Sequence, residues 1–281
     1  MTVTIQAFLQ QAVARISDSG VSHSELLDAE VILAHAMSVS RVYLIANPRE
    51  TIGQTALSKA GALLLQRCDG VPIAYIVGYK EFWSLEFKVN EAVLIPRPDS
   101  EIIVQRALEK TDDGGSRLAD LGTGSGAIAV AIASEMPHSE VVAVDRSTAA
   151  LDMAEKNALK VGVRNILFFE SDWYQNLGNE QFEIIVANPP YIAEKDPHLL
   201  GEVRFEPQQA LVAGDSGYSD LSHIIQFAPD HLRPGGWLLV EHGYDQGNRV
   251  RQTFAEHGFS EISTMVDLAG NERVTEGRLA R

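Results

Sequence analysis

The sequence has almost no cysteine: Cys68 is the single one among 281 residues. One thiol excludes an internal disulfide and leaves no second ligand for a CxxC metal or redox site. We expect Cys68 to be a small buried side chain. Because proteins of oxidising compartments usually carry paired cysteines, this shortage favours the cytoplasm as the location.

Long apolar runs are missing as well. The longest, AIAVAIA at 127–133, is far shorter than the about 18 apolar residues of a membrane span. The opening segment MTVTIQAFLQ has neither a basic region nor a long apolar stretch, so it does not resemble a secretory signal. We therefore expect no membrane partner.

Basic charge is scarce, since 23 Lys and Arg residues stand against 38 Asp and Glu residues and give a formal net charge of −15. Such a balance repels phosphate backbones, so we expect no direct nucleic-acid partner. The 8 histidines form no HxxxH or HExxH pair, and we expect no metal. Hydrophobic residues make up 45% of the chain, enough for a large core.

The N-terminal part, residues 1–75, is predicted to be a small helical bundle. Its apolar side chains recur at helical spacing, as at Ile5, Phe8, Ala12 and Ile16. Nothing in this segment has catalytic spacing, and we predict that the bundle is a recognition domain, because binding of a single side chain elsewhere would offer too little surface for selectivity.

Residues 76–97 are predicted to form a β-hairpin that links two domains. The apolar period shortens to two residues here, at Trp83, Leu85, Phe87 and Val89. We expect the chain to turn at Asn90 and Glu91. A helix follows, with Asp99 or Ser100 as its predicted N-cap.

Residues 98–281 are predicted to be an α/β domain with a mostly parallel sheet. Short β-rich runs alternate with helical ones. The β-rich runs are RLADLG, VVAVD, LFFES, FEIIVANPP and GGWLLVEHG. In such sheets ligands bind outside the carboxyl ends of the strands, so the residues that end these runs are the candidates for function.

A glycine loop follows the first strand of this domain. It consists of Gly122, Thr123, Gly124, Ser125 and Gly126. The glycines allow a tight turn and a close approach of the backbone to a ligand. The second strand ends at Asp145, whose carboxylate can accept hydrogen bonds from ribose hydroxyls. The loop predicts a nucleoside cofactor, and by itself leaves a dinucleotide and S-adenosylmethionine both open.

The fourth strand ends in Asn188, Pro189, Pro190 and Tyr191. The two prolines make a stiff turn. The Asn188 amide oxygen and the Pro189 carbonyl can accept the two hydrogens of a planar NH2 group, while the Tyr191 ring lies against it. These residues are the candidate catalytic and substrate-binding groups. The motif resembles the [N/D]PP[Y/F] signature of class I methyltransferases, which favours S-adenosylmethionine as the cofactor.

This signature occurs in enzymes that methylate DNA bases, RNA guanine or protein glutamine. The net charge of −15 favours a protein acceptor. A base methyltransferase, a glutamine methyltransferase of a ribosomal protein and a binding module without catalysis remain as alternatives. Since no side chain deprotonates a carboxamide at neutral pH, we expect no essential general base.

Nearly the whole chain resembles one family, the release factor glutamine methyltransferases of the HemK type. The resemblance is carried by the motifs above together with GVPIAYIVGYKEFWSLEFKV, VLIPRPDSE, ESDWY, VRFEPQQALVAGDSGYSDL and NERVTEGR. It implies a Rossmann-like class I domain with a seven-stranded sheet. It also implies N5-methylation of the glutamine in the GGQ motif of class I peptide chain release factors, with S-adenosylhomocysteine as the coproduct. Separately from the resemblance, we expect the protein to be a monomer.

The resemblance also assigns roles to residues. The loop Gly122–Gly126 borders the methionine part of the cofactor, Asp145 binds the ribose and Trp173 lies beside the adenine. Asn188–Tyr191 hold the substrate amide, with Asn188 also near the cofactor. Among weaker candidates, we interpret His242 as a histidine with satisfied hydrogen bonds.

Overall fold

The computed structural model describes residues 2–111, 115–214 and 216–280. The chain divides into two compact units. A helical unit comprises Met1–Tyr79 with His198–Phe205, and a sheet unit comprises Lys80–Pro197 with Glu206–Arg281. None of the described helices is long and apolar enough to cross a membrane.

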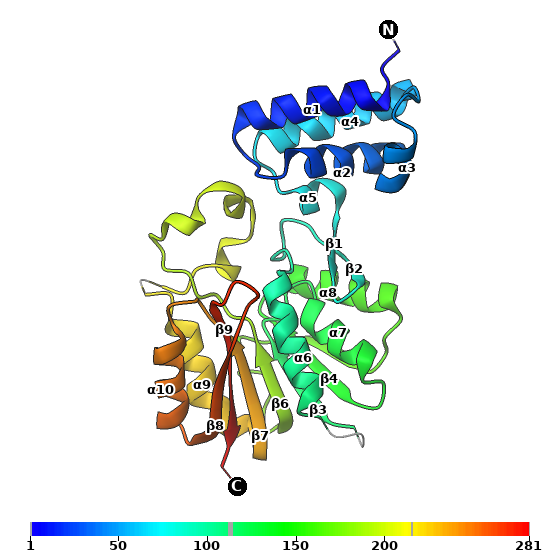
Figure 1. Cartoon of the computed structure of the whole chain (residues 1–281). Coiled ribbons are helices and arrows are strands. Elements are labelled where there is room, and N and C mark those ends of the chain that lie inside the picture. Colours follow the sequence, from blue (N-terminus) through cyan, green and yellow to red (C-terminus); the bar gives the residue numbers. More distant parts are fainter. Residues whose placement is uncertain (1, 112–114, 215, 281) are drawn as a thin grey trace. The chain divides into compact units, whose positions relative to one another are not determined.

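The helical unit confirms the predicted helical N-terminal region (Figure 1). Its helices are α1 (Ile5–Ser19), α2 (Glu25–Met37), α3 (Arg41–Ala46), α4 (Gln54–Cys68) and α5 (Ile73–Val77). The predicted apolar stripe of α1 is buried in the core of this unit. Cys68 packs against that core as a small side chain, but it is only partly buried, whereas the expectation was a buried one. It ends α4, where the helix surface reaches solvent.

A segment distant in sequence completes the helical unit. The 3-10 turn Gly201–Phe205 lies in the polar stretch after Tyr191, yet Glu202 forms an ion pair with Arg67 of α4. Arg67 is 2% exposed, and its Nε donates to Asp28 Oδ2 at 2.7 Å. The Arg67 guanidinium also donates to the carbonyls of Val21 and Val71. One buried cation therefore joins α2, α4 and this turn.

The sheet unit confirms the predicted α/β fold. Its strands are β3 (Arg117–Leu121), β4 (Glu140–Asp145), β5 (Ile166–Glu170), β6 (Phe182–Ala187), β7 (Leu232–Glu241), β8 (Phe259–Val266) and β9 (Glu272–Leu279). Among the described residues they form one seven-stranded sheet in the order β5-β4-β3-β6-β7-β9-β8. The first five strands of this order pair in parallel, and β9 runs antiparallel to both neighbours.

Helices cover both faces of this sheet. They are α6 (Glu101–Glu109), α7 (Ala127–Glu135), α8 (Thr148–Val161), α9 (Ser219–His231) and α10 (Gly247–Glu256). Because side chains alternate along a strand, Leu118 of β3 packs with α6 and α7, whereas Ala119 and Leu121 pack with α9 and α10. The two cores form a three-layer arrangement, and the apolar run at 127–133 is the buried part of α7.

The predicted hairpin is present, but its turn lies elsewhere. Strands β1 (Tyr79–Phe82) and β2 (Leu85–Lys88) are joined at Trp83 and Ser84, with φ of 52° and 55°. The chain also turns at Asn90 and Glu91 as expected, where the Val93 N–H donates to the Asn90 carbonyl at 3.1 Å, but this turn follows β2 and does not join the two hairpin strands. Two positive φ angles are typical of a type I′ turn, which usually carries Asn or Gly. Here tertiary contacts stabilise it, because the Trp83 backbone N–H and indole N–H donate to Glu101 and Glu135.

Candidate active site

The strand order reverses direction at the centre of the sheet. From β3 the chain adds β4 and β5 on one side, and then β6 and β7 on the other. In open α/β sheets this switch point leaves a crevice outside the carboxyl ends of the strands. The glycine loop, Asp145 and Asn188 follow β3, β4 and β6, so the fold brings these separate motifs to one edge.

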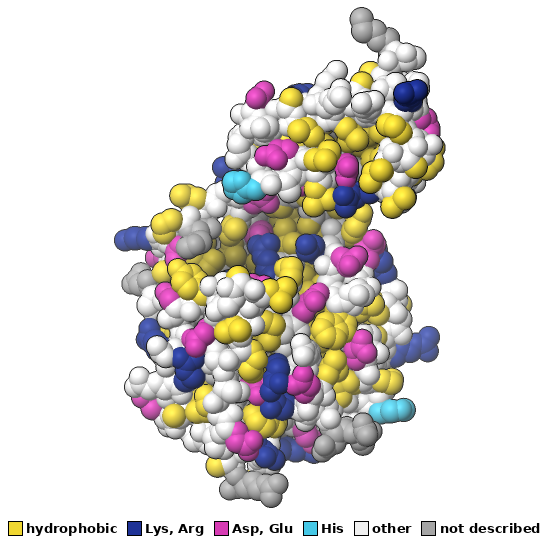
Figure 2. Space-filling model, in the orientation of Figure 1, with side chains coloured by type: hydrophobic (Ala, Val, Ile, Leu, Met, Phe, Trp, Pro, Cys, Tyr) yellow, Lys and Arg dark blue, Asp and Glu magenta, His cyan; other side chains and the backbone are white. Residues whose placement is uncertain are grey.

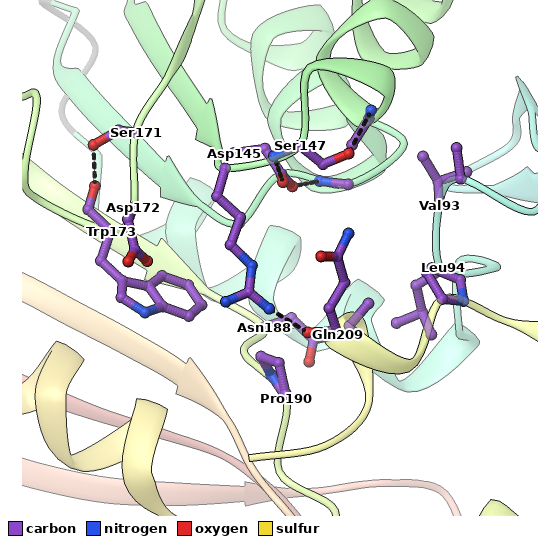
Figure 3. Close-up of a pocket in the computed structure, with 17 residues that line it drawn as sticks. Val93, Leu94, Asp145, Ser147, Ser171, Asp172, Trp173, Asn188, Pro190 and Gln209 are labelled. Carbon is purple, nitrogen blue, oxygen red and sulfur yellow. Dashed lines mark hydrogen bonds between the residues drawn. The ribbon is translucent and has the colours of Figure 1, made fainter. Parts of the chain in front are cut away.

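A cleft of about 650 Å³, including the part open to solvent, occupies this position. Of the predicted site residues, those that line it are Gly122, Gly124, Asp145, Trp173, Asn188 and Pro190. In Figure 3 the Trp173 ring lies on one side of the cleft and Val93 and Leu94 on the other, with Asp145, Asn188 and Gln209 between them.

Trp173 and Gly122 form one wall of the cleft together. Gly122 has a φ of +75°, and a Cβ added to it would lie 3.0 Å from Cζ3 of Trp173. Burial raises the pKa of the nearby Asp220, and Arg146 and the Trp173 side chain oppose that rise. The Trp173 ring therefore lies directly against the Gly122 backbone, where a side chain would displace it. A flat ring in this position suits a flat ligand group stacked beside it.

Asp145 is held by backbone N–H groups. Its Oδ2 accepts from Gly124 N and its Oδ1 from Ser147 N, both at 2.9 Å. Burial raises the pKa of Asp145, and these two N–H groups oppose that rise. Each oxygen keeps a lone pair for a further donor. A fixed carboxylate in the cleft wall fits a ligand with paired hydroxyls.

The other loop residues build the turn behind the cleft. Thr123 Oγ1 donates to the buried Asp120 at 2.7 Å, and burial raises the pKa of Asp120 to about 7. The Ser125 carbonyl accepts from Asn157 of α8. A Cβ on Gly126 would lie 2.9 Å from Cβ of Ala154. These residues fix the loop against its own unit.

The Asn188 side chain is part of a hydrogen-bonded chain that the sequence motifs did not reveal. Asn188 Nδ2 donates to Ser100 Oγ at 3.0 Å, and Ser100 Oγ donates to Glu241 Oε2 at 2.6 Å. Ser100 is the N-cap residue of α6, one of the two predicted, but its side chain makes no cap hydrogen bond. Glu241 ends β7, and its place at a strand end was the one local signal that could have identified it.

Tyr191 contacts the same series of hydrogen-bonded side chains. Pro189, between Asn188 and Pro190, is buried. Tyr191 OH donates to Glu241 Oε1 at 3.2 Å, and its ring packs against the core under α9 and α10. Burial and the nearby Glu241 raise the pKa of Tyr191 well above its usual value. The interpretation of His242 as a histidine with satisfied hydrogen bonds is confirmed. Its Nδ1 is bonded to the Gly243 carbonyl and its Nε2 to Thr275 Oγ1.

Two contacts hold the polar stretch after Tyr191 in place, and one of them involves cleft-lining residues that the sequence motifs did not identify. Glu206 accepts from the Ile95 N–H at 3.0 Å and pairs with Arg97, which ties the stretch after Tyr191 to the segment before α6. Arg146 and Gln209 also line the cleft, and the Arg146 guanidinium donates a hydrogen bond to the Gln209 backbone carbonyl at 3.0 Å. Among the residues that the structure describes, no three acidic, histidine or cysteine side chains are grouped to hold a metal.

The sheet order and the site define a class I methyltransferase that depends on S-adenosylmethionine. A methyltransferase from Pyrococcus furiosus has the same fold, with a TM-score of 0.55 at 19% identity over 80% of this chain and 100% of that chain. The models of the methyltransferase small domain and the PrmC N-terminal domain match residues 99–214 and 7–78.

Relatives in bacteria define the family more closely. A release factor glutamine methyltransferase of Aliivibrio fischeri is 46% identical over 280 residues, which are 99% of this chain and 98% of that protein. The one of Escherichia coli is 45% identical over 274 residues, or 97% and 98% of the two chains. The protein belongs to the release factor glutamine methyltransferase family.

Proposed function

We propose that this protein transfers a methyl group from S-adenosylmethionine to the N5 side-chain nitrogen of the GGQ glutamine in class I peptide chain release factors, in the cytoplasm. One observation carries the proposal. Asn188, from the motif that suits a planar NH2 group, lines the same cleft as Gly122, Asp145 and Trp173. An acceptor amide held by Asn188 therefore adjoins the site that suits the cofactor.

The cofactor site is proposed from these contacts. Asp145 would accept the ribose hydroxyls, Trp173 would lie beside the adenine, and the backbone at Gly122 and Gly124 would border the methionine part. When bound, the cofactor supplies a methyl group on a positively charged sulfur, which is a strong electrophile.

The protein's own contribution is position and polarity. The Asn188 amide oxygen and the Pro189 carbonyl would accept the two amide hydrogens and orient the nitrogen for in-line attack. Positioning of this kind lowers the barrier substantially without acid-base chemistry. The buried carboxylate of Glu241 already accepts from Ser100 and Tyr191, in keeping with a reaction that needs no general base.

The helical unit is the proposed binding site for the rest of the release factor. On α3, Val42 and Ile45 are 73% and 66% exposed, and Leu26 of α2 is 55% exposed. Figure 2 shows hydrophobic side chains gathered on the visible face of this unit. On the sheet unit in the same view, acidic and basic side chains are mixed rather than forming a basic area, which supports a protein acceptor.

The proposed acceptor is tested by incubating the full chain with methyl-labelled S-adenosylmethionine and one possible acceptor at a time. The acceptors are a release factor, the same factor with its GGQ glutamine changed to alanine, a ribosomal protein extract and duplex DNA. We expect label only on the intact factor. Label on the changed factor or on DNA would contradict the proposal, and label on ribosomal protein alone would replace the acceptor.

The proposed cofactor wall predicts a difference between two glycines. Gly122→Ala is expected to weaken S-adenosylmethionine binding by about 10-fold, because backbone strain and a displaced Trp173 ring together cost about 1–3 kcal/mol. Gly124→Ala is the matched control. Its φ is +57°, but nothing lies within 4 Å of an added Cβ. Calorimetric titration gives both dissociation constants, and an equal effect of the two variants would contradict a wall formed by Trp173.

A further inference from the structure

We propose that Ser100 and Glu241 are positioning residues that determine which end of the Asn188 side-chain amide faces the acceptor. The inference rests on the proposed function for the identity of that acceptor. Its physical basis is the direction of three hydrogen bonds within the sheet unit.

Glu241 determines the donor-to-acceptor direction of these hydrogen bonds. An ionised carboxylate only accepts hydrogen bonds, and Glu241 is 1% exposed, so solvent does not compete for it. Ser100 has one hydroxyl hydrogen, which is donated to Glu241 Oε2 at 2.6 Å. Ser100 Oγ is then left as an acceptor toward Asn188.

Asn188 has an amide with a donor end and an acceptor end. Its Nδ2 donates to Ser100 Oγ at 3.0 Å, which turns Oδ1 away from Ser100. Oδ1 is the atom that an acceptor NH2 group needs. If the Ser100 hydroxyl pointed the other way, the Asn188 amide would turn over and present N–H groups to an NH2 group, leaving two donors facing each other.

Tyr191 completes the arrangement. Its hydroxyl donates to Glu241 Oε1 at 3.2 Å. One carboxylate oxygen therefore binds Tyr191 directly, and the other is linked to Asn188 through Ser100. Burial raises the pKa of Glu241, while the Ser100 and Tyr191 hydroxyls oppose the rise; Asp99 raises it and Arg273 lowers it. Ser100 and Glu241 are 141 residues apart in the sequence, and the fold brings them together beside Asn188.

Three variants test this inference by turnover on the release factor. Ser100→Ala is expected to lower kcat by about 10- to 100-fold, as a displaced reacting group does, with the S-adenosylmethionine dissociation constant changed less than about 3-fold. Ser100→Thr keeps the hydroxyl and is expected to retain most activity. Glu241→Leu removes both carboxylate oxygens, so the Ser100 hydroxyl loses the acceptor that determines its direction, and this variant is expected to lower kcat as Ser100→Ala does. Ser134→Ala, whose hydroxyl bonds within α7, is the matched control and is expected to be silent.

A double variant separates positioning from a general structural effect. If Ser100 acts through Asn188, Ser100→Ala adds little to the kcat loss of Asn188→Ala, because the amide it orients is gone. Fully additive losses, or near-normal kcat in both Ser100→Ala and Glu241→Leu, would overturn the inference.

An NMR measurement keeps the test independent of the acceptor. The Asn188 Nδ2 hydrogens, assigned by their loss in Asn188→Ala, are expected to exchange slowly in the wild type and at least about 10-fold faster in Ser100→Ala. Unchanged exchange would overturn the inference. A wild type that leaves glutamine unmethylated but shows this protection would contradict the proposed function alone.

Discussion

Asn188→Ala is expected to lower turnover on the release factor by about 100-fold or more. Asn188 lines the cleft, and its Oδ1 is the proposed acceptor for the reacting amide. Removing one positioned polar group at a reacting centre typically costs 10²- to 10³-fold in kcat. The measurement is single-turnover transfer of labelled methyl at saturating S-adenosylmethionine.

Cofactor affinity distinguishes this effect from a damaged cleft. Asn188→Ala is expected to change the S-adenosylmethionine dissociation constant by less than about 3-fold, whereas Asp145→Ala weakens cofactor binding more, because it removes the proposed ribose acceptor. The matched control Asn248→Ala lies on the exposed surface of α10 and is expected to be silent in both assays. Near-normal turnover in Asn188→Ala would contradict the proposed slot for the amide.

Arg67→Ala is expected to lower the free energy of unfolding of the helical unit by about 3–5 kcal/mol. Removing one partner of a buried ion pair leaves the other charge unpaired in the core. Asp28 is 6% exposed and would lose the Arg67 Nε donor at 2.7 Å, while Glu202 would lose its ion pair. Two backbone carbonyls would lose a donor as well.

The distribution of tryptophan allows the two units to be followed separately. All 3 tryptophans, Trp83, Trp173 and Trp237, lie in the sheet unit, so their fluorescence follows that unit. Hydrogen exchange of α2 and α4 amides follows the helical unit. Arg41→Ala is the matched control, because the Arg41 side chain is 47% exposed in its pair with Glu30 and is expected to contribute about 1 kcal/mol. An Arg67→Ala effect no larger than this control would be contrary to the expectation.

Local sequence patterns were sufficient for much of the sheet unit. The buried strands β3, β4 and β6 and the helix α7 follow from their apolar runs and flanking glycines. Strands β8 and β9 carry charged and polar residues between their apolar ones, so no run identified them. The hairpin turn was placed wrongly because a left-handed Trp83 is unfavourable locally and is stabilised by Glu101 and Glu135.

For the site, the sequence alone determined the chemistry that each motif supports: a glycine loop, an acid after the next strand and an Asn-Pro-Pro-Tyr turn. Glycine conformations and proline turns are properties of a few adjacent residues, so spacing predicts them. Which loop residues face the cleft, and which face the protein as Thr123 and Gly126 do, depends on α8 and on Asp120.

Only the tertiary structure decided that Ser100 and Glu241 lie beside Asn188, and that Glu202 forms an ion pair with Arg67. Ser100 and Asn188 are 88 residues apart, and Arg67 and Glu202 are 135 residues apart. At such separations a serine before a helix or a glutamate in a polar stretch has no local pattern to distinguish it. The physical reason is burial: a polar group shielded from water needs a partner, and the packed strands and helices determine which one is within reach.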